Sequence, residues 1–203
     1  MKIVLAGVVG VGKSTISDKL AQKLNFKVMQ EPVADNPYLD DFYGNPKEFA
    51  FKMQIFMLMA RSKQLKAAID EENVIFDRSI LEDPIFVEVL KAQNNISDVD
   101  YQVYYDFYNH VVVSSLYFDP KIKPDLIVYL QVTTDNAIKR IVQRGRESEK
   151  HVDSGYWELL NQKYQEWYQK NKDKFPFLVV DTNSKNPDEI VEEIITTIKN
   201  SSS

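Results

Sequence analysis

The sequence predicts a three-layer α/β fold in which helices cover both faces of a five-stranded parallel sheet. Short runs rich in Val, Ile and Leu alternate along the chain with longer segments of helical periodicity. These runs are apolar throughout rather than at every second residue, as expected for strands covered on both faces. Glycine and proline stand singly at the joints, and no linker or internal repeat separates the segments. We therefore expect one domain over residues 1–203.

The expected elements follow from the apolar runs and from the residues that end them. Strands are expected at residues 3–6, 27–31, 73–77, 125–130 and 177–181. Helices are expected at residues 14–24, 47–71, 80–91, 98–117, 134–144, 157–171 and 187–199. Pro32 stops the second strand, turn-forming residues make 36–46 a loop, and Pro187 suits the first turn of the last helix. Residues 200–203 are expected to form a disordered tail.

A glycine-rich segment joins the first strand to the first helix. It has the spacing G-x-x-x-x-G-K-[ST] of a phosphate-binding loop and consists of Gly7, Val8, Val9, Gly10, Val11, Gly12, Lys13 and Ser14, with Thr15 next in the helix. Glycines let backbone N–H groups turn inward around an anion, and the helix start adds its positive dipole end. We expect Lys13 to reach the β- and γ-phosphates and Ser14 to ligate Mg²⁺. The segment predicts a nucleoside triphosphate site on a P-loop kinase-like fold, rather than a plain glycine turn with a surface lysine.

Charged residues follow the second and third strands, whose carboxyl ends should meet the phosphate loop in one crevice. Asp77 ends an apolar strand and can hold Mg²⁺ directly or through water, or can merely cap the next helix. Glu31 can accept the proton of an acceptor hydroxyl, unless it is an ordinary loop carboxylate. Arg78 can hold Glu31 and stabilise charge on the transferred phosphoryl group, or can form a structural ion pair.

Three arginines at the end of the 134–144 helix predict a lid over residues 144–153. Arg140 and Arg144 are one helical turn apart, and Gly145 separates Arg144 from Arg146. Guanidinium groups can bind phosphate oxygens as fork-shaped donors when such a lid closes. The alternative is simple placement of cations at a helix C-terminus, but the nearby phosphate loop favours the lid.

Composition narrows the partners of this site. The 203 residues carry a net charge of −5, and their basic residues are dispersed except around 140–146, so a nucleic-acid polymer is not the expected partner. The chain has no cysteine, which fits a reducing compartment. No apolar run is long enough to cross a membrane, and no leader is expected before the first strand. These features predict a cytoplasmic protein that acts on a small molecule and has no membrane partner.

The expected 47–71 helix has apolar residues around most of its circumference. One core contact requires only a stripe of apolar residues, so we expect a second face to pack on another subunit in a homodimer. The expected 98–117 helix carries many tyrosines. We assign them to the core or to a subunit interface rather than to stacking on nucleic-acid bases.

An ordered set of segments behind the phosphate loop resembles the deoxyribonucleoside kinases, a family that includes deoxycytidine, deoxyguanosine and bacterial deoxyadenosine kinases. The segments are Glu31-Pro32-Val33, residues 54–61, Asp77-Arg78-Ser79 with Asp83, Arg140-x-x-x-Arg144-Gly145-Arg146, and Glu149. The resemblance covers nearly the whole chain. It implies Mg²⁺-dependent transfer of a phosphoryl group from ATP to the 5′-hydroxyl of a deoxyribonucleoside in nucleotide salvage, with deoxyadenosine favoured.

The resemblance also implies roles for residues that spacing alone would leave on the surface. Tyr43 and Glu149 match the residues that hold the deoxyribose 3′-hydroxyl. Gln54 suits the paired donor and acceptor edge of adenine or cytosine. Two further groups match family positions: Arg61 with Asp83 beyond the base, and Asp181, Thr182 and Asn183 at the donor base. Where the family places a stacking phenylalanine, this chain departs from the pattern and has Val87 beside Phe86. Asp77 replaces the family's usual glutamate, which can change its reach to the metal.

Two other functions fit parts of the sequence. A nucleoside monophosphate kinase, such as a thymidylate kinase, would need an extra cation for the acceptor phosphate, whereas Glu31, Asp83 and Glu149 favour a neutral acceptor. A non-catalytic nucleotide switch resembling small GTPases would need an N-K-x-D motif after a strand, and the sequence contains none.

Overall fold

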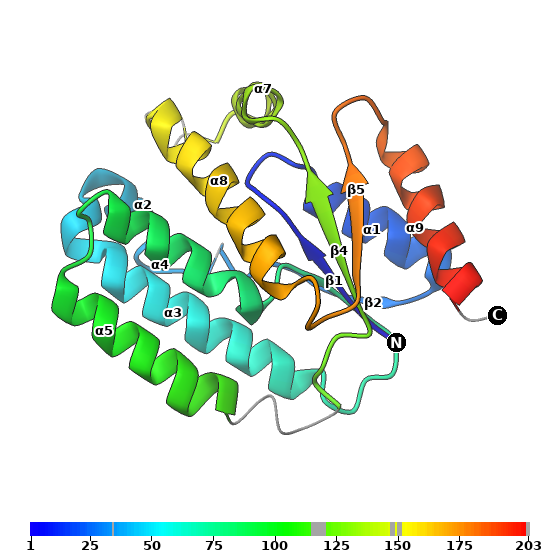
Figure 1. Cartoon of the computed structure of the whole chain (residues 1–203), viewed down its shortest axis with the longest axis horizontal. Coiled ribbons are helices and arrows are strands. Elements are labelled where there is room, and N and C mark those ends of the chain that lie inside the picture. Colours follow the sequence, from blue (N-terminus) through cyan, green and yellow to red (C-terminus); the bar gives the residue numbers. More distant parts are fainter. Residues whose placement is uncertain (34, 115–120, 147–148, 150–151, 202–203) are drawn as a thin grey trace.

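Five parallel strands form one sheet at the centre of the structure, which is a computed structural model describing residues 1–33, 35–114, 121–146, 149 and 152–201 (Figure 1). The strands are β1 (Lys2–Ala6), β2 (Lys27–Met29), β3 (Val74–Asp77), β4 (Leu126–Gln131) and β5 (Phe177–Asp181). Their order is β2-β3-β1-β4-β5, and every neighbouring pair is parallel. The predicted five-stranded α/β fold is therefore confirmed.

The strand order determines where ligands can bind. From β1 the chain crosses to β2 and β3 on one side, and it then returns to β4 on the other side of β1. The connections therefore diverge at the carboxyl end of β1, and this is the point where open parallel sheets form their binding crevice. The phosphate loop follows β1 directly.

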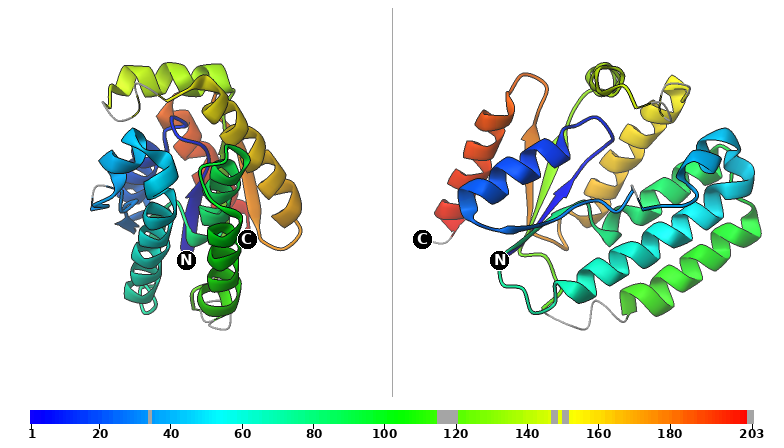
Figure 2. Two further views of the ribbon diagram at one scale, coloured as in Figure 1. Left: turned by 90° about the vertical axis from the view of Figure 1, so that its left-hand side faces the viewer. Right: turned by 180° about the vertical axis from the view of Figure 1, so that it is seen from behind.

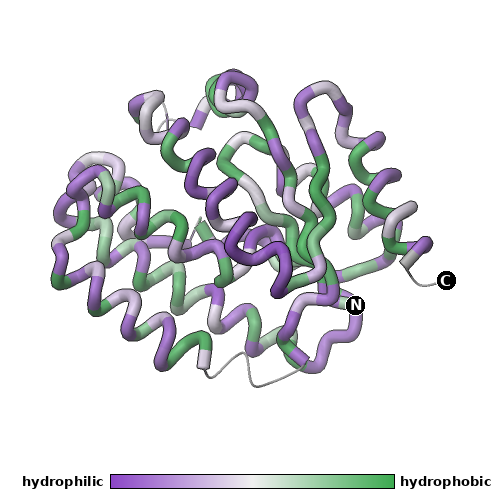
Figure 3. The backbone as a smooth tube through the Cα atoms, in the orientation of Figure 1, coloured by the Kyte–Doolittle hydropathy of each residue, from purple (hydrophilic) through white to green (hydrophobic). Residues whose placement is uncertain are grey.

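Helices cover both faces of the sheet (Figure 2). On one face α1 (Lys13–Leu24) packs beside α9 (Pro187–Ser201), and these helices share a buried cluster with Ile3 and Leu5 of β1. On the other face Val4 and Ala6 share a cluster with residues of α3 (Pro46–Ala67), α4 (Asp83–Ala92) and α5 (Asp98–Phe107). Successive residues of β1 therefore point to opposite layers, which explains why the strand is apolar throughout. Figure 3 shows this as a mostly hydrophobic centre surrounded by helices of mixed hydropathy.

Two further helices lie near the carboxyl ends of the strands. α7 (Thr134–Arg144) follows β4, and α8 (Ser154–Asn171) runs from the end of the predicted lid back along the sheet (Figure 1). α7 ends as predicted, because Gly145 adopts a left-handed conformation with φ of 69°. α8 begins three residues before the predicted start, because the Asp153 side chain accepts a hydrogen bond from the N–H of Gly155.

Several predicted boundaries are wrong. Strand β2 ends at Met29, so Glu31 lies in a loop, and the predicted loop 36–46 contains the helix α2 (Leu39–Gly44), which buries Phe42. The predicted 80–91 helix is divided into a 3₁₀ turn, η1 (Ile80–Glu82), and α4. The predicted 98–117 helix becomes a π-helix, η2, at Tyr108–Val113, and residues 115–117 lie outside the described ranges.

The C-terminal tail is shorter than predicted. Helix α9 continues to Ser201, so residues 200 and 201 are helical, and residues 202–203 are not described. The helix extends this far because Ile190, Val191 and Ile194 are anchored in the core. The single-domain organisation stays a prediction.

Candidate active site

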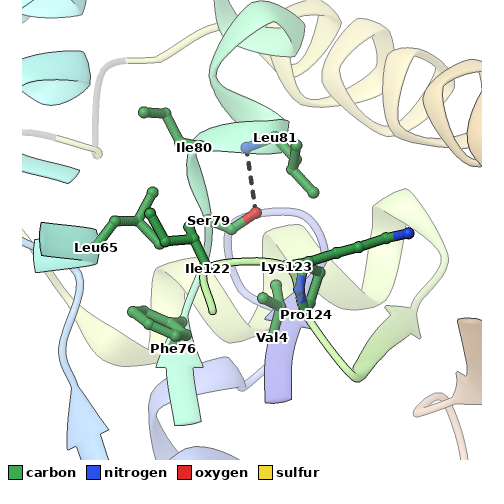
Figure 4. Close-up of a pocket in the computed structure, with 9 residues that line it drawn as sticks. All are labelled: Val4, Leu65, Phe76, Ser79, Ile80, Leu81, Ile122, Lys123 and Pro124. Atoms are coloured by element: carbon green, nitrogen blue, oxygen red, sulfur yellow. Dashed lines mark hydrogen bonds between the residues drawn. The ribbon is translucent and has the colours of Figure 1, made fainter. Parts of the chain in front are cut away.

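A cavity with a volume of about 780 Å³ opens at the carboxyl ends of the strands. Its lining includes many of the predicted site residues, namely Val9, Gly10, Gly12, Lys13, Ser14, Thr15, Glu31, Tyr43, Gln54, Arg61, Asp77, Arg78, Phe86, Arg140, Arg144, Arg146 and Glu149. A second cavity, between β1, β3 and residues 122–124, has only about 40 Å³ (Figure 4). That space suits a water molecule or two, not a nucleoside, so the larger cavity is the candidate active site.

The phosphate loop adopts a conformation that requires glycine. Gly7 and Gly10 have φ of +146° and +83°, and a Cβ on either would come within 2.6 Å of a carbonyl oxygen, that of Leu130 or Ala137. The loop therefore packs directly on the backbone of β4 and α7. Residues 7, 8 and 11 of the loop are buried in the protein interior. Gly12 precedes the first turn of α1 with φ of 100°.

Lys13 is buried at this loop. Its Nζ donates hydrogen bonds to the carbonyl oxygens of Gly7 and Val8, at 2.9 and 3.0 Å. Burial, together with the charge of Arg78, lowers the pKa of Lys13 to about 8, although Asp77 and Glu31 act in the opposite direction. The ammonium group is thus held in a partly desolvated position where a phosphate would be a strong partner.

Ser14 and Asp77 bring two hard oxygen atoms together. The Ser14 hydroxyl donates to Asp77 Oδ2 at 2.5 Å. The other carboxylate oxygen, Asp77 Oδ1, is buried and has no hydrogen-bond partner within the described part of the chain. This donor set fits Mg²⁺, which prefers one or two carboxylates or hydroxyls and takes its remaining ligands from phosphates and water.

Two arginines hold Glu31 through the same oxygen. Arg78 Nε lies 2.8 Å from Glu31 Oε1, and Arg61 Nη2 donates to that oxygen at 2.7 Å. Burial alone would raise the pKa of Glu31, but the charges of Arg78, Arg61 and Lys13 outweigh it and lower the pKa to about 2. The predicted pairing of Arg78 with Glu31 is present, and the contact of Arg61 with Glu31 is an addition that the sequence did not predict.

Arg61 also forms the predicted ion pair with Asp83, through Nη1 and Oδ1. Both side chains are buried, and Arg61 Nε and Asp83 Oδ2 have no hydrogen-bond partner among the described residues. Gln54 lies about two helical turns before Arg61 on α3 and lines the same cavity. Asp83 therefore acts on the cavity through Arg61, while Gln54 and Arg61 present polar groups to it.

Glu149 and Tyr43 lie at the lid side of the cavity. Glu149 is buried and pairs with Arg144 Nη2 at 2.5 Å and with Arg146 Nη1 at 3.6 Å. Burial and the charge of Glu149 raise the pKa of Tyr43 to about 12, so its hydroxyl stays a hydrogen-bond donor. Residues 147, 148, 150 and 151 of the predicted lid lie outside the described ranges.

Arg140 is fixed to the floor of the site. Its guanidinium donates to the carbonyl oxygen of Val11 at 3.2 Å and to the carbonyl oxygen of Thr182 at 2.6 Å. The neighbouring strand end is also tightly bonded, because Asp181 accepts the N–H of Asn183 at 2.9 Å and Asn183 accepts the N–H of Thr133 at 2.9 Å. The end of β5 thus packs against the phosphate loop and the start of α7, close to where the donor base was predicted.

Comparisons with known proteins agree with this geometry. The family model described as deoxynucleoside kinase matches residues 3–202. The chain belongs to the deoxynucleoside kinase family. Members of this family transfer a phosphoryl group from ATP to a deoxynucleoside, so the chain is an enzyme and not a nucleotide switch or a nucleoside monophosphate kinase.

Individual relatives of this kinase are similar over most of their length. The deoxyadenosine/deoxycytidine kinase of Bacillus subtilis is 38% identical over 81% of this chain and 75% of the relative. The deoxyguanosine kinase of Lactobacillus johnsonii is 33% identical over 97% of this chain and 92% of the relative. The structure of deoxyadenosine kinase from M. mycoides with products dCMP and dCDP has a TM-score of 0.91 and 46% identity, covering 98% of this chain and 100% of that one.

One predicted site residue of the kinase is misplaced. Val87 is completely buried in the core cluster with α3 and α5, whereas the preceding residue, Phe86, lines the cavity and lies under the Arg78 guanidinium. Neighbouring residues on a helix point about 100° apart, and on α4 this difference turns Val87 into the core while Phe86 faces the cavity. Phe86 is thus the aromatic residue of this pair that reaches the site.

The sequence patterns missed other residues of the kinase site. Met53, Met57, Tyr156 and Trp157 line the cavity, and Glu82 lies buried behind it. Only Glu82 had a local signal, since Ser79-x-x-Glu82 has the spacing of a capping box. The other four look like ordinary core residues of helices until the tertiary structure places them.

Proposed function

We propose that this kinase phosphorylates the 5′-hydroxyl of deoxyadenosine with MgATP and accepts deoxycytidine or deoxyguanosine less well. The support is that the structures similar to this chain include deoxyadenosine kinases of M. mycoides, solved with dATP, with dCTP and with dCMP. The amide of Gln54 and the Arg61–Asp83 pair also suit a base edge that carries both a donor and an acceptor.

The observation that carries the proposal is the position of Glu31. Its carboxylate is held by Arg78 and Arg61, and it faces the same cavity as Lys13 and the phosphate loop. An acceptor hydroxyl bound to Glu31 would thus approach the outermost phosphate of a nucleotide on the loop. Such positioning accounts for much of the rate enhancement in phosphoryl transfer.

The low pKa of Glu31 defines its part in the reaction. A carboxylate with a pKa of about 2 is a weak base at neutral pH. We infer that Glu31 accepts a hydrogen bond from the 5′-hydroxyl and orients it, and that the proton moves only as the new bond to phosphorus forms. Arg78 neutralises charge on the transferred group, while Lys13 binds the β- and γ-phosphates.

Ser14 and Asp77 would hold Mg²⁺. The free Oδ1 of Asp77 and the adjacent Ser14 hydroxyl support this assignment. When bound, the ion would neutralise charge on the phosphate oxygens of ATP. The side chain of Asp77 is shorter than that of the glutamate common in the family, but it still contacts the Ser14 hydroxyl.

The sugar and base have separate contacts. The protonated Tyr43 hydroxyl and the Glu149 carboxylate supply a donor and an acceptor for the 3′-hydroxyl. Arg144 and Arg146 reach Glu149 from the lid, so sugar binding and lid closure share one residue. Phe86 provides an apolar surface beside Arg78 for the base.

A panel of labelled nucleosides tests the proposal. With MgATP, deoxyadenosine should give the highest kcat/KM, followed by deoxycytidine or deoxyguanosine. Thymidine and deoxyadenosine monophosphate should give at most about one hundredth of that value, because thymine has no exocyclic amino group for the Gln54 amide and the monophosphate places a phosphate beside Glu31. Equal turnover of deoxyadenosine and its monophosphate would contradict the proposal.

A homodimer remains part of the proposal, and we infer that most of its apolar contact comes from α5. α2, α4 and α5 pack around α3 and cover many of the apolar residues on its circumference. Four large exposed apolar residues follow α5 and its continuation, with exposures of 71, 50, 42 and 49% for Val99, Val103, Phe107 and Val111, while Met59 is exposed on α3. Their four-residue spacing forms one face, which a second copy can cover.

No helix in the described ranges is long and apolar enough to cross a bilayer. The cytoplasmic location and the lack of a nucleic-acid partner stay predictions.

A further inference from the structure

Glu82 is a completely buried carboxylate that joins three parts of the site. Its Oε2 accepts hydrogen bonds from the Gly7 N–H at 3.3 Å and from the Tyr164 hydroxyl at 2.8 Å. Its Oε1 accepts the Ser79 N–H at 3.0 Å. These donors belong to the phosphate loop, to α8 and to the turn after β3. A buried carboxylate is costly unless it is paired and hydrogen-bonded, and both conditions are met here.

The backbone of Arg78 is held in an unfavourable conformation. Its φ is +73°, in the left-handed region that residues other than glycine rarely adopt. The Arg78 N–H donates to the carbonyl oxygen of Leu5 at 3.0 Å, and the next N–H, that of Ser79, donates to Glu82. The Ser79 hydroxyl in turn accepts the N–H of Leu81 at 3.2 Å (Figure 4). Glu82 therefore fixes the main chain immediately after the strained residue.

The side chain of Arg78 is held by the same carboxylate. Arg78 Nη1 lies 3.4 Å from Glu82 Oε2 and also donates to the Tyr164 hydroxyl, which in turn donates a hydrogen bond to Glu82. Arg78 Nε is then left to face Glu31 at 2.8 Å. The guanidinium lies 4.8 Å above the ring of Phe86, which limits its rotation.

We propose that Glu82 is a positioning residue for phosphoryl transfer, which holds the guanidinium of Arg78 and the main chain after it in place. It acts through Arg78 and touches neither substrate, so the inference rests on the proposed function of Arg78. A purely structural role as the cap of η1 would affect stability but not turnover of the folded enzyme.

The test is a double-mutant cycle of Glu82→Gln and Arg78→Ala. The glutamine keeps the size and an acceptor oxygen but removes the charge. Glu88→Gln is the control, because Glu88 lies on the following helix, α4, and likewise contacts one cation and one tyrosine, Lys163 and Tyr105, but does not line the cavity. Measurements are kcat, KM for deoxyadenosine, Kd for ATP and the urea midpoint of unfolding.

We expect Glu82→Gln to lower kcat about thirtyfold while KM and the Kd for ATP change less than about threefold, and Glu88→Gln to behave as wild type. In the Arg78→Ala background, Glu82→Gln should change kcat less than about twofold, since the residue through which it acts is gone. A full thirtyfold loss in that background would overturn the inference, because Glu82 would then act independently of Arg78.

The same experiment separates this inference from the proposed function. Wild-type kcat in Glu82→Gln together with a large loss in Arg78→Ala would overturn the inference alone. Wild-type kcat in Arg78→Ala would overturn the role of Arg78 and with it this inference. If Glu82→Gln does not fold, Tyr164→Phe replaces it, since the ring remains and only the hydroxyl between Arg78 and Glu82 is lost. That variant should lower kcat about fivefold, and an unchanged kcat would overturn the inference.

Discussion

Arg61 Nη2 lies 2.7 Å from Glu31 Oε1, so an arginine from the base side of the cavity is a direct ion-pair partner of the carboxylate that faces the acceptor hydroxyl. The same arginine is bound to Asp83 by its other terminal nitrogen. Contacts with the base and the orientation of the hydroxyl are therefore mechanically linked through Arg61. A substitution intended to alter base selection at this position should also alter turnover.

Glu31→Gln should leave ATP binding nearly intact and lower kcat at least about a hundredfold, because the amide cannot accept the hydroxyl proton. Arg78→Ala should have a similar effect through loss of the charge that faces the phosphoryl group. ATP affinity by fluorescence titration and turnover with deoxyadenosine check both variants. Wild-type turnover in either would refute the role assigned to that residue.

Arg61→Gln should shift the acid side of the kcat profile toward neutral pH. The wild-type pKa of Glu31 is lowered to about 2, so the active carboxylate is ionised at every pH above about 4. Removing Arg61 deletes one of the cations that lower this pKa, so Glu31 becomes protonated, and activity is lost, at a higher pH than in wild type. The check is kcat between pH 4.5 and 8, within the range where unfolding controls stay flat. Lys66→Gln, on the same helix, should keep the wild-type profile.

ATP binding near pH 8 should take up about half a proton per site. Burial lowers the pKa of Lys13 to about 8, and the phosphates of bound ATP would raise it again. Calorimetric titrations in two buffers with different ionisation enthalpies measure this uptake. Equal heats in both buffers would contradict the assignment. Lys19→Gln, which removes an exposed lysine of α1 that pairs with Asp188, should leave the uptake unchanged.

Gly10→Ala should weaken ATP binding more than about tenfold and lower the free energy of unfolding by about 1–3 kcal/mol. The added Cβ would lie 2.6 Å from the carbonyl oxygen of Ala137, at a φ of +83°. Gly44→Ala is the control, since a Cβ there meets no atom within 4 Å. Unfolding by urea and ATP titration measure the two effects. Equal behaviour of the two variants would show that the loop tolerates a side chain.

Val103→Glu should convert the proposed homodimer into monomers. A charge at the centre of the exposed α5 face would be buried without a partner if two copies met there. Molar mass by light scattering at several concentrations is the measurement, and Val142→Glu, at a highly exposed position of α7, is the control. A wild-type mass that stays monomeric at all concentrations would rule out the dimer itself.

The elements whose signals are local were predictable from sequence. The phosphate loop is one continuous motif, and the strands of the sheet were found because both of their faces are apolar. Helix α2 was missed because its stability comes from Phe42, which packs into a cluster built by α3 and residues far along the chain. The pairing of Glu31 with Arg78 was predicted from their positions at the ends of neighbouring strands.

The residues that hold the catalytic side chains in place were harder to predict from the sequence. The capping box of Ser79 and Glu82 is visible in the sequence, but Glu82 contacts Gly7 and Tyr164 across 75 and 82 residues. No local pattern links such positions. Similarly, nothing in the sequence distinguishes Phe86, which reaches the cavity, from the buried Val87 until the orientation of α4 on α8 is known.

The anchoring of Arg140 has a consequence for how the enzyme opens and closes. Since the Arg140 side chain binds the carbonyl oxygens of Val11 and Thr182, α7 is fixed to the phosphate loop and to the residue after β5. Gly145, with φ of 69°, ends this anchored helix, so Arg144 belongs to the fixed helix and Arg146 to the chain that follows it. Glu149 pairs with both guanidinium groups, so its carboxylate connects the fixed helix to the chain beyond Gly145.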